Sequence, residues 1–254
     1  MLIVATNFPA PAQVTARPAS ADAAANLTAD RLVDELVENA ARDHATLPSM
    51  TAHESIVSKV DEFALHGKTH VNAEANVRIA RKSSEGDWSE IREYTSVNGK
   101  PVAPNTKVAL PFTIANSFDD HQGDFFSAQN RSCYNFSLAA RTAPDAPLEL
   151  TITPLPGSAS SHCTSRSGTA RIDPATHRLI HLEFAYLPSA NIPQWTVSVD
   201  YAATKVGDGT FNLPSMVATR IVLGKTPNEW TARYSDYHQY TSSVTIRPAD
   251  DSAQ

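Results

Sequence analysis

The stretch His70-Val-Asn-Ala-Glu-Ala-Asn-Val-Arg-Ile79 alternates polar and apolar residues along its whole length. Every second residue, from Val71 to Ile79, is apolar, and the residues between them are polar. Because successive side chains of a strand point to opposite faces of a sheet, this alternation predicts a strand with one buried and one solvated face. Strands of this kind are typical of antiparallel sheets, so the stretch predicts antiparallel pairing.

The same alternation returns in Tyr134–Leu138, Leu148–Thr153, Ile180–Tyr186 and Trp195–Tyr201. Turn signals such as Asn98-Gly99 separate the strand-like runs. We expect about ten or eleven strands, at residues 49–63, 69–81, 88–97, 100–103, 131–140, 147–154, 166–173, 178–187, 194–206, 210–223 and 229–247. Pro214 is a candidate break in the run 210–223, and the run 229–247 is expected to divide into two strands.

One amphipathic helix is expected before the strands, at about Ala29–His44. Thr28 is the candidate N-cap, and Asp30 lies in the first turn, where the helix dipole favours an acid. Leu47-Pro48 is expected to end the helix. Its apolar stripe consists of two adjacent rows, Leu32, Leu36, Ala40 and Val33, Val37, Ala41.

A wide sheet with one apolar face must cover that face. With one good helix available, the economical solution is an α+β fold in which a large curved antiparallel sheet, an open half-barrel, wraps around the N-terminal helix. The segment 111–126 is expected to help to fill its concave side. We expect residues 27–248 to form a single domain, with flexible tails at residues 1–26 and 249–254.

Composition excludes several classes of function. The chain has 254 residues and a formal net charge of -6, whereas nucleic-acid binders usually carry a basic face. Its 9 glycines are few for phosphate-cradling loops or a dinucleotide fold. No apolar run approaches the roughly 18–20 residues of a transmembrane helix. GxSxG, HExxH, GxGxxG and P-loop motifs are absent, so we expect no cofactor, no metal and no catalytic residue.

The two cysteines, Cys133 and Cys163, have no CxxC partner, which argues against a thiolate zinc site. Two interpretations remain open: a pair of buried free thiols, or one disulfide. The choice depends on the redox compartment. A disulfide predicts that the two Cα atoms lie about 4.4–6.8 Å apart.

The N-terminal residues bear on the compartment. Met1–Ala5 is apolar but short, and Ala10-Pro11-Ala12-Gln13 fits the small-x-small pattern of a signal-peptide cleavage site. We interpret residues 1–26 as the remnant of a signal peptide followed by a linker, with a cytosolic tail as the alternative. The first interpretation predicts a periplasmic or secreted bacterial protein.

Two clusters of polar residues are weak candidates for chemistry. Asp119–Asp124 gathers carboxylates and an imidazole, and its simpler interpretation is a solvated loop or the N-terminus of a helix. Tyr234–Tyr240 is rich in hydrogen-bonding side chains, and alternation places Tyr234 on the same face as Asp236, His238 and Tyr240. The last three could serve catalysis or orient a ligand. A polar ladder that fixes the strand register is the commoner arrangement.

The second half of the chain resembles a group of periplasmic half-barrel proteins. The resemblance lies in Gly168–His177, Ile180–Tyr186, Trp195–Tyr201, Gly209–Pro214 and Tyr234–Tyr240, with their G-x-x-x-I-D-x-x-T, V-x-Y and F-x-L-P patterns. The group comprises the lipoprotein carrier, its outer-membrane receptor and related sigma-factor regulators (LolA/LolB/RseB-type). The resemblance implies an open half-barrel closed by helices over an apolar cavity. The lipobox cysteine of lipoproteins is absent from the N-terminal region.

The leading hypothesis is a non-enzymatic extracytoplasmic binding domain that holds a lipid, an acyl chain or an apolar peptide segment in the concave side of the sheet. The resemblance implies lipid or lipoprotein acyl chains, or an apolar segment of another exported protein, as partners. The residues expected to contact the ligand are Leu36, Phe184, Tyr186, Trp195 and Tyr201. One alternative is a structural or protein-interaction domain with a filled core; another is an enzyme that uses Asp236, His238 and Tyr240.

Overall fold

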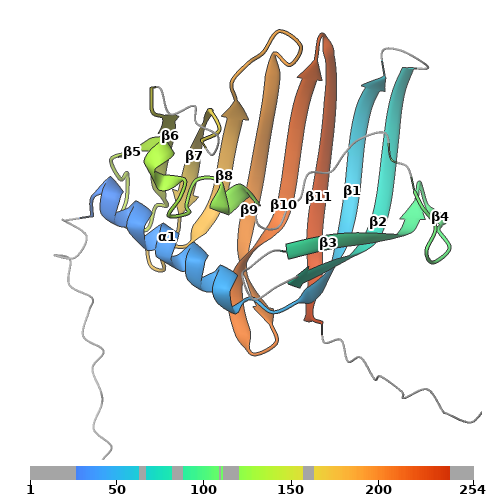
Figure 1. Ribbon diagram of the computed structural model, residues 1–254, viewed down its shortest axis with the longest axis horizontal. Coiled ribbons are helices and arrows are strands. Elements are labelled where there is room, and N and C mark those ends of the chain that lie inside the picture. The colour runs from blue at the N-terminus through green and yellow to red at the C-terminus, as the bar shows by residue number, and fades with distance from the viewer. Residues whose placement is uncertain are drawn as a thin grey trace, which may run out of the picture.

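A computed structural model describes residues 27–62, 67–81, 88–108, 110, 120–156 and 163–240. In this part of the chain, the helix α1 (Ala29–Thr46) lies against an eleven-stranded sheet, with the short helix α2 (Asp120–Gly123) and the 3-10 turn η2 (Arg131–Cys133) beside it (Figure 1). The strands are β1 (Met50–Glu62), β2 (Gly67–Arg81), β3 (Trp88–Val97), β4 (Lys100–Pro101), β5 (Tyr134–Leu138), β6 (Leu148–Pro154), β7 (Arg166–Ile172), β8 (Leu179–Tyr186), β9 (Gln194–Val206), β10 (Gly209–Leu223) and β11 (Thr226–Gln239).

The sheet is open and antiparallel throughout. Its strand order is β4-β3-β2-β1-β11-β10-β9-β8-β7-β6-β5, so β4 and β5 are the edge strands. The first long strand, β1, pairs with the last, β11, and this pairing joins the two runs of consecutive hairpins. The expected α+β architecture, a large antiparallel half-barrel with an N-terminal helix, is confirmed.

The strand boundaries differ from the sequence predictions in a few places. β5 begins at Tyr134, because residues 131–133 form a 3-10 turn. β10 runs through Pro214 without a break, and the irregularity appears instead as a register shift against β9 between Pro214 and Met216. β11 is one strand within the described residues, so the expected division of residues 229–247 is wrong up to Gln239. The rest of that run, the tails and most of segment 111–126 lie outside the described residues.

The sequence of α1 explains its limits. The side chain of Thr28 accepts a hydrogen bond from the backbone N–H of Arg31 (3.3 Å), as expected of an N-cap. The helix ends at Thr46, one residue before Leu47, whose backbone N–H donates to the carbonyl of Asp43 (2.8 Å). Leu32, Val33 and Leu36 are buried in the core that the sheet provides, so the predicted apolar stripe packs on the sheet. We call the face that α1 covers the concave face.

Polar contacts fasten α1 at both ends and in between. Near its start, Asp34 accepts a hydrogen bond from Arg131 (2.7 Å), beside edge strand β5. In the middle, Glu35 pairs with His177, and that hydrogen bond is the main reason why the pKa of Glu35 lies below its ordinary value. Further along, Asp43 pairs with Arg178 (3.0 Å) in the β7–β8 connection.

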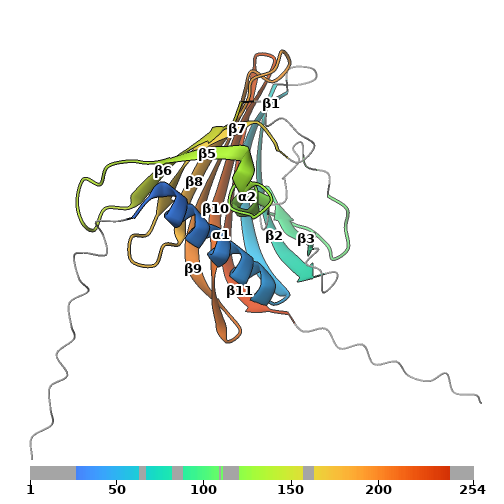
Figure 2. The ribbon, with the colours of Figure 1, turned by 60° about the vertical axis from the view of Figure 1, so that its left-hand side comes forward.

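The C-terminal end of α1 is held by β2 and β3, which lie near the opposite edge of the sheet from β5. The indole N–H of Trp88 in β3 donates to His44 Nε2 (3.0 Å). Arg81 of β2 donates to the backbone carbonyls of His44 (2.5 Å) and Leu47 (3.2 Å). The helix therefore runs across the strands, with its first turns beside β5 and its last turn beside β3 (Figure 2).

Leu36→Ala should lower the free energy of unfolding by about 2–4 kcal/mol, because it leaves a cavity beneath a helix that cannot fully collapse onto the sheet. Leu36 is 1% exposed in the wild-type structure. The measurement is urea unfolding of the variant and the wild type. Val37→Ala is the matched control, since Val37 lies at the margin of the core. Equal losses for the two variants would contradict this packing.

Candidate functional site

The register of the strands divides the concave face into rows of residues. One row runs across β9, β10, β11, β1 and β2 through Val197, Thr219, Trp230, Ser58 and Val71. A second row, nearer α1, consists of Val199, Val217, Ala232, Ile56 and Ala73. All ten side chains are buried, and most are apolar. These two rows give the concave face a buried and mostly apolar centre.

Aromatic side chains fill the concave face over β5 to β9. Phe125 and Phe126, which follow α2, are fully buried. The ring of Phe125 contacts Tyr134 (centroids 5.0 Å apart) and Phe184 (5.2 Å). The rings of Tyr186 and Trp195 stack at 4.1 Å. The segment that carries Phe125 and Phe126, which we call the aromatic plug, therefore covers the part of the sheet next to α1.

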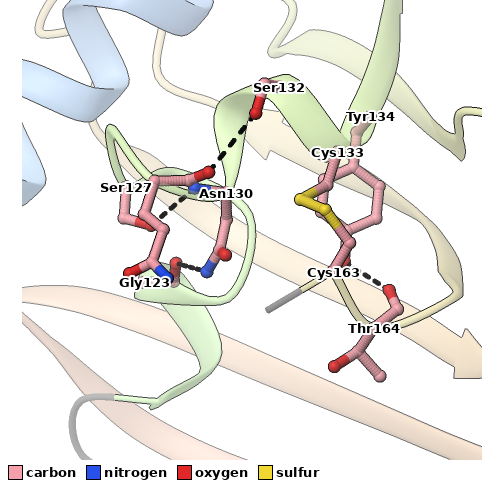
Figure 3. The surroundings of a disulfide bond; sticks show 9 residues. Gly123, Ser127, Asn130, Ser132, Cys133, Tyr134, Cys163 and Thr164 are labelled. Atoms are coloured by element: carbon pink, nitrogen blue, oxygen red, sulfur yellow. Dashed lines mark hydrogen bonds between the residues drawn. A yellow bond between two sulfur atoms is a disulfide. The ribbon is translucent and has the colours of Figure 1, made fainter. Parts of the chain in front are cut away.

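A disulfide and local hydrogen bonds hold the chain that follows the plug (Figure 3). Cys133 is joined to Cys163 with their Cα atoms 5.5 Å apart, within the range expected for a bridge. The hydroxyl of Tyr134 donates to the carbonyl of Thr164 (2.8 Å), and the side chain of Asn130 donates to the carbonyl of Gly123 (3.0 Å). These contacts fasten the plug to the start of β5 and to the residues before β7.

One buried cation sits against the plug. Arg166 pairs with Asp124 and lies over the rings of Phe125, Phe184 and Tyr186, at 5.0–5.8 Å from their centroids. His121 is 6% exposed, and its ring contacts Phe184. Residues 120–123 form the short helix α2, in line with the helical form of the simpler interpretation, whereas a solvated loop is wrong for His121, which is buried. The rings of Phe125, Phe184 and Tyr186 cover the side chains of Arg166 and His121, and because Phe184 and Tyr186 come from another segment of the chain, no local sequence pattern reveals the burial.

Charged groups are also buried on the concave face of β1 and β3. Glu54 is 0% exposed and accepts hydrogen bonds from Arg92 (2.8 and 3.2 Å) and from the hydroxyl of Tyr234 (2.7 Å). Arg92 also pairs with Glu90 (2.5 Å). We call Glu54, Glu90 and Arg92 the acidic network, since two carboxylates share one guanidinium.

The two carboxylates of the acidic network affect the pKa of Arg92 and that of the nearby Tyr237. Burial lowers the pKa of Arg92, but the hydrogen bond to Glu54 and the charges of both carboxylates outweigh burial and leave that pKa above its ordinary value. Burial and then the charges of Glu54 and Glu90 raise the pKa of Tyr237. Arg92 therefore stays charged and Tyr237 stays neutral. Sequence reasoning missed this network, although Glu54 occupies an apolar phase of the alternation between Ala52 and Ile56.

A β-bulge in β11 changes the predicted faces of Tyr234–Tyr240. The register shifts between Thr51 and His53 of β1, and Asp236 adopts a left-handed φ of 53°. Tyr234 consequently lies on the concave face with Glu54, whereas His238 pairs with Thr51 on the opposite, convex face. The prediction that Tyr234 shares a face with Asp236 and His238 is therefore wrong.

The bulge borders a pocket of about 440 Å³ on the convex face. The three residues suspected of catalysis gather there in part: Asp236 and His238 line the pocket, and the ring of Tyr240 lies under Arg78, which also lines it. His53, another lining residue, pairs with Glu74 (3.0 Å). Among the described residues, no group of three or more His, Cys, Asp or Glu side chains is arranged to hold a metal ion.

The residues expected to contact a ligand all lie on the concave side of the domain. Leu36 and Phe184 are buried core residues. Burial raises the pKa of Tyr201, which keeps its hydroxyl neutral. Tyr186 and Trp195 are half-buried and stacked on one another, next to the plug. The structure therefore brings Phe184, Tyr186 and Trp195 together and leaves Leu36 and Tyr201 in other parts of the core.

No protein-family model matches the sequence, and no curated protein matches it. Among solved structures, the chain is similar to a LolA superfamily protein from Nitrosomonas europaea, with 12% sequence identity and a TM-score of 0.37 over 85% of this chain and 96% of that one. It is also similar to a DUF1329 family protein from Desulfovibrio piger, with 7% identity and a TM-score of 0.45 over 86% and 96%. A third is an outer membrane lipoprotein-sorting protein domain from Vibrio parahaemolyticus, with 11% identity and a TM-score of 0.38 over 83% and 93%. The group named by the sequence resemblance is thus represented among these structures, and the likeness is one of fold.

Arg92→Leu should lower the free energy of unfolding by about 3–5 kcal/mol, because it leaves the carboxylates of Glu54 and Glu90 buried without their cation. Urea unfolding of the variant and the wild type at neutral pH measures the loss. Arg78→Leu is the control: its pair with Glu93 is exposed and should contribute at most about 1 kcal/mol. A loss for Arg92→Leu no larger than that of the control would contradict the assignment.

Proposed function

We propose that this protein is a non-enzymatic extracytoplasmic binding domain whose concave face holds a lipid acyl chain or an apolar segment of another exported protein. The observation that carries this proposal is how the concave face is covered. In the described residues, α1 and the aromatic plug are its covers, and each is a separate segment fastened to the sheet by side chains.

The way α1 is fastened supports an opening movement. Its contacts from Asp34, Glu35 and Asp43 are partly exposed side-chain pairs with Arg131, His177 and Arg178. Exposed pairs contribute little, typically about 0–1 kcal/mol each. The apolar burial of the helix stripe holds it in place, and an inserted apolar chain would restore much of that burial. Parting α1 from the sheet therefore costs less in the presence of an apolar ligand than in its absence.

The residues that would meet such a chain are Phe184, Tyr186 and Trp195, with Leu36 and Tyr201 deeper in the core. Aromatic rings bury large apolar areas, and a Trp or Tyr at the margin keeps a polar atom available. The stacked pair of Tyr186 and Trp195 lies at the margin of the plug, since Tyr186 contacts Phe184 and Phe184 contacts Phe125. This pair is the best candidate for the wall of a binding groove.

A protein-interaction domain with a filled core is the second candidate. The specific observation in its favour is the complete burial of Phe125, Phe126 and Phe184, which occupy the concave face over β5 to β8. An enzyme that uses Asp236, His238 and Tyr240 is a weaker third candidate. The hydrogen bond described for Asp236 comes from Ser235 (3.3 Å), its neighbour in the chain.

An oxidising compartment is the expected location of the protein. The Cys133–Cys163 disulfide supports a periplasmic or secreted protein, since such bonds persist outside the reducing cytosol. Among the described residues, no helix is long and apolar enough to cross a membrane.

The test is titration of the full chain with a fluorescent acylglycerol and a fluorescent fatty acid. At least one probe should bind saturably with micromolar or better affinity. Trp195→Ala should weaken that binding about tenfold, because it removes a wall residue and leaves the sheet backbone paired. Its loss of unfolding free energy should be small beside this effect.

Ile91→Ala is the matched control, since Ile91 is an exposed residue of β3, and it should leave probe binding unchanged. Failure of the folded wild type to bind either acyl probe would overturn the carrier proposal. The filled-core interaction domain would then be the better account.

A further inference from the structure

Among the described residues of the concave face, three buried polar atoms lack a protein partner. They are the hydroxyl of Ser58, the side-chain carbonyl of Asn228 and the indole nitrogen of Trp195. Ser58 is 2% exposed and Asn228 is 7% exposed. Buried polar atoms in folded proteins are nearly always hydrogen-bonded to protein or to ordered water. Three such atoms within one region call for a partner that the described part of the chain does not supply.

The register places the three residues close together. Trp195 pairs with Ile221 and Ile221 with Asn228, so Trp195 and Asn228 lie in one row across β9, β10 and β11. Ser58 pairs with Trp230 in the next row, which makes it a diagonal neighbour of Asn228. The row of Trp195 and Asn228 lies farther from α1 than the row of Ser58, at the end of the concave face opposite the helix.

We propose that Ser58, Asn228 and Trp195 form the polar end of the concave binding face and select acyl ligands whose polar group is an uncharged ester or amide. This inference rests on the proposed function, because it specifies which apolar ligand the face accepts. The indole N–H and the hydroxyl donate hydrogen bonds, and the carboxamide both donates and accepts. An ester or amide carbonyl can accept from the donors, and a ligand hydroxyl or amide N–H can donate to Asn228.

A free fatty acid fits this end of the face poorly. Burying a carboxylate requires a cation, and none of the three residues is charged. The cations described on the concave face are already engaged: Arg166 by Asp124, Arg92 by Glu54 and Glu90, and Arg81 by the carbonyls of His44 and Leu47. Arg166 and Arg92 face three carboxylates, so neither is left to pair with a ligand carboxylate. Glu54 lies on the same strand and face as Ser58, about 13 Å away.

The experiment compares monolauroylglycerol with laurate as competitors for the fluorescent acylglycerol, with the full chain at about pH 8, where laurate is ionised. The glycerol ester should bind at least about tenfold more tightly than laurate, the ratio expected when a carboxylate must be buried without a cation. Equal affinities, or tighter binding of laurate, would overturn the inference and leave the proposed function standing. If neither competitor binds, both the inference and the proposed function fail.

Variants test the role of the individual atoms. Asn228→Leu and Ser58→Ala should each weaken binding of the ester about 2–10-fold, the typical effect of one hydrogen bond, and leave laurate unchanged. Their urea midpoints should stay equal or rise, because each change removes a buried polar atom that has no partner among the described residues. Ser198→Ala, which lies on β9 between the buried residues Val197 and Val199 and so on the other face, is the control. Unchanged ester affinity in both variants would mean that the atoms bind water only, and would overturn the inference.

Discussion

The burial of one helix stripe against an open sheet is the constraint on which this structure depends. Leu32, Val33 and Leu36 of α1 join the same core as the inner residues of the strands, from β2 on one side to β5 on the other. An open sheet exposes an apolar face unless another layer covers it, and in the described residues that layer is α1 together with the aromatic plug. The order of the strands, the cross-link at Cys133 and the ion pairs along α1 all serve to hold this thin layer over the concave face.

The polar groups on the concave face follow from the same constraint. A sheet that only filled its own core would be expected to place apolar residues, or fully paired polar ones, at these positions. The acidic network meets that requirement through the contacts of Glu54 with Arg92 and Tyr234. Within the part of the chain that the structure describes, Ser58 and Asn228 do not meet it. The acidic network is therefore a structural group whose polar atoms are paired. Ser58 and Asn228 form a second group, at the end of the concave face that lies away from α1, and it has no partner among the described residues.

Much of the fold could be predicted from the sequence, because alternation along the strands and the capped helix are local signals. Thr28, Leu32 and Leu36 play the parts that their spacing predicts. Alternation could not predict the bulge at Asp236, where one residue adopts a left-handed conformation. The extra residue of the bulge moves the side chains that follow it to the opposite face, and the alternation of polar and apolar residues gives no sign of it. Nor could it predict that Glu54 would be buried with Arg92, because their pairing depends on the register of β1, β2 and β3. The candidate ligand residues Phe184, Tyr186 and Trp195 were found because they are aromatic. Ser58 and Asn228 were missed although each, like Glu54, is a polar residue at an apolar phase of its strand.

The central claim is that the concave face is a binding surface for an apolar chain with an uncharged polar end. Native mass spectrometry of the protein, purified under mild conditions after export to an oxidising compartment, tests it most directly. The account predicts a second population of the folded protein, heavier by the mass of one lipid or acyl-bearing molecule, which dissociates as a neutral ester or amide. A single population at the mass of the bare chain, retained when the protein is incubated with excess acylglycerol, would contradict the account.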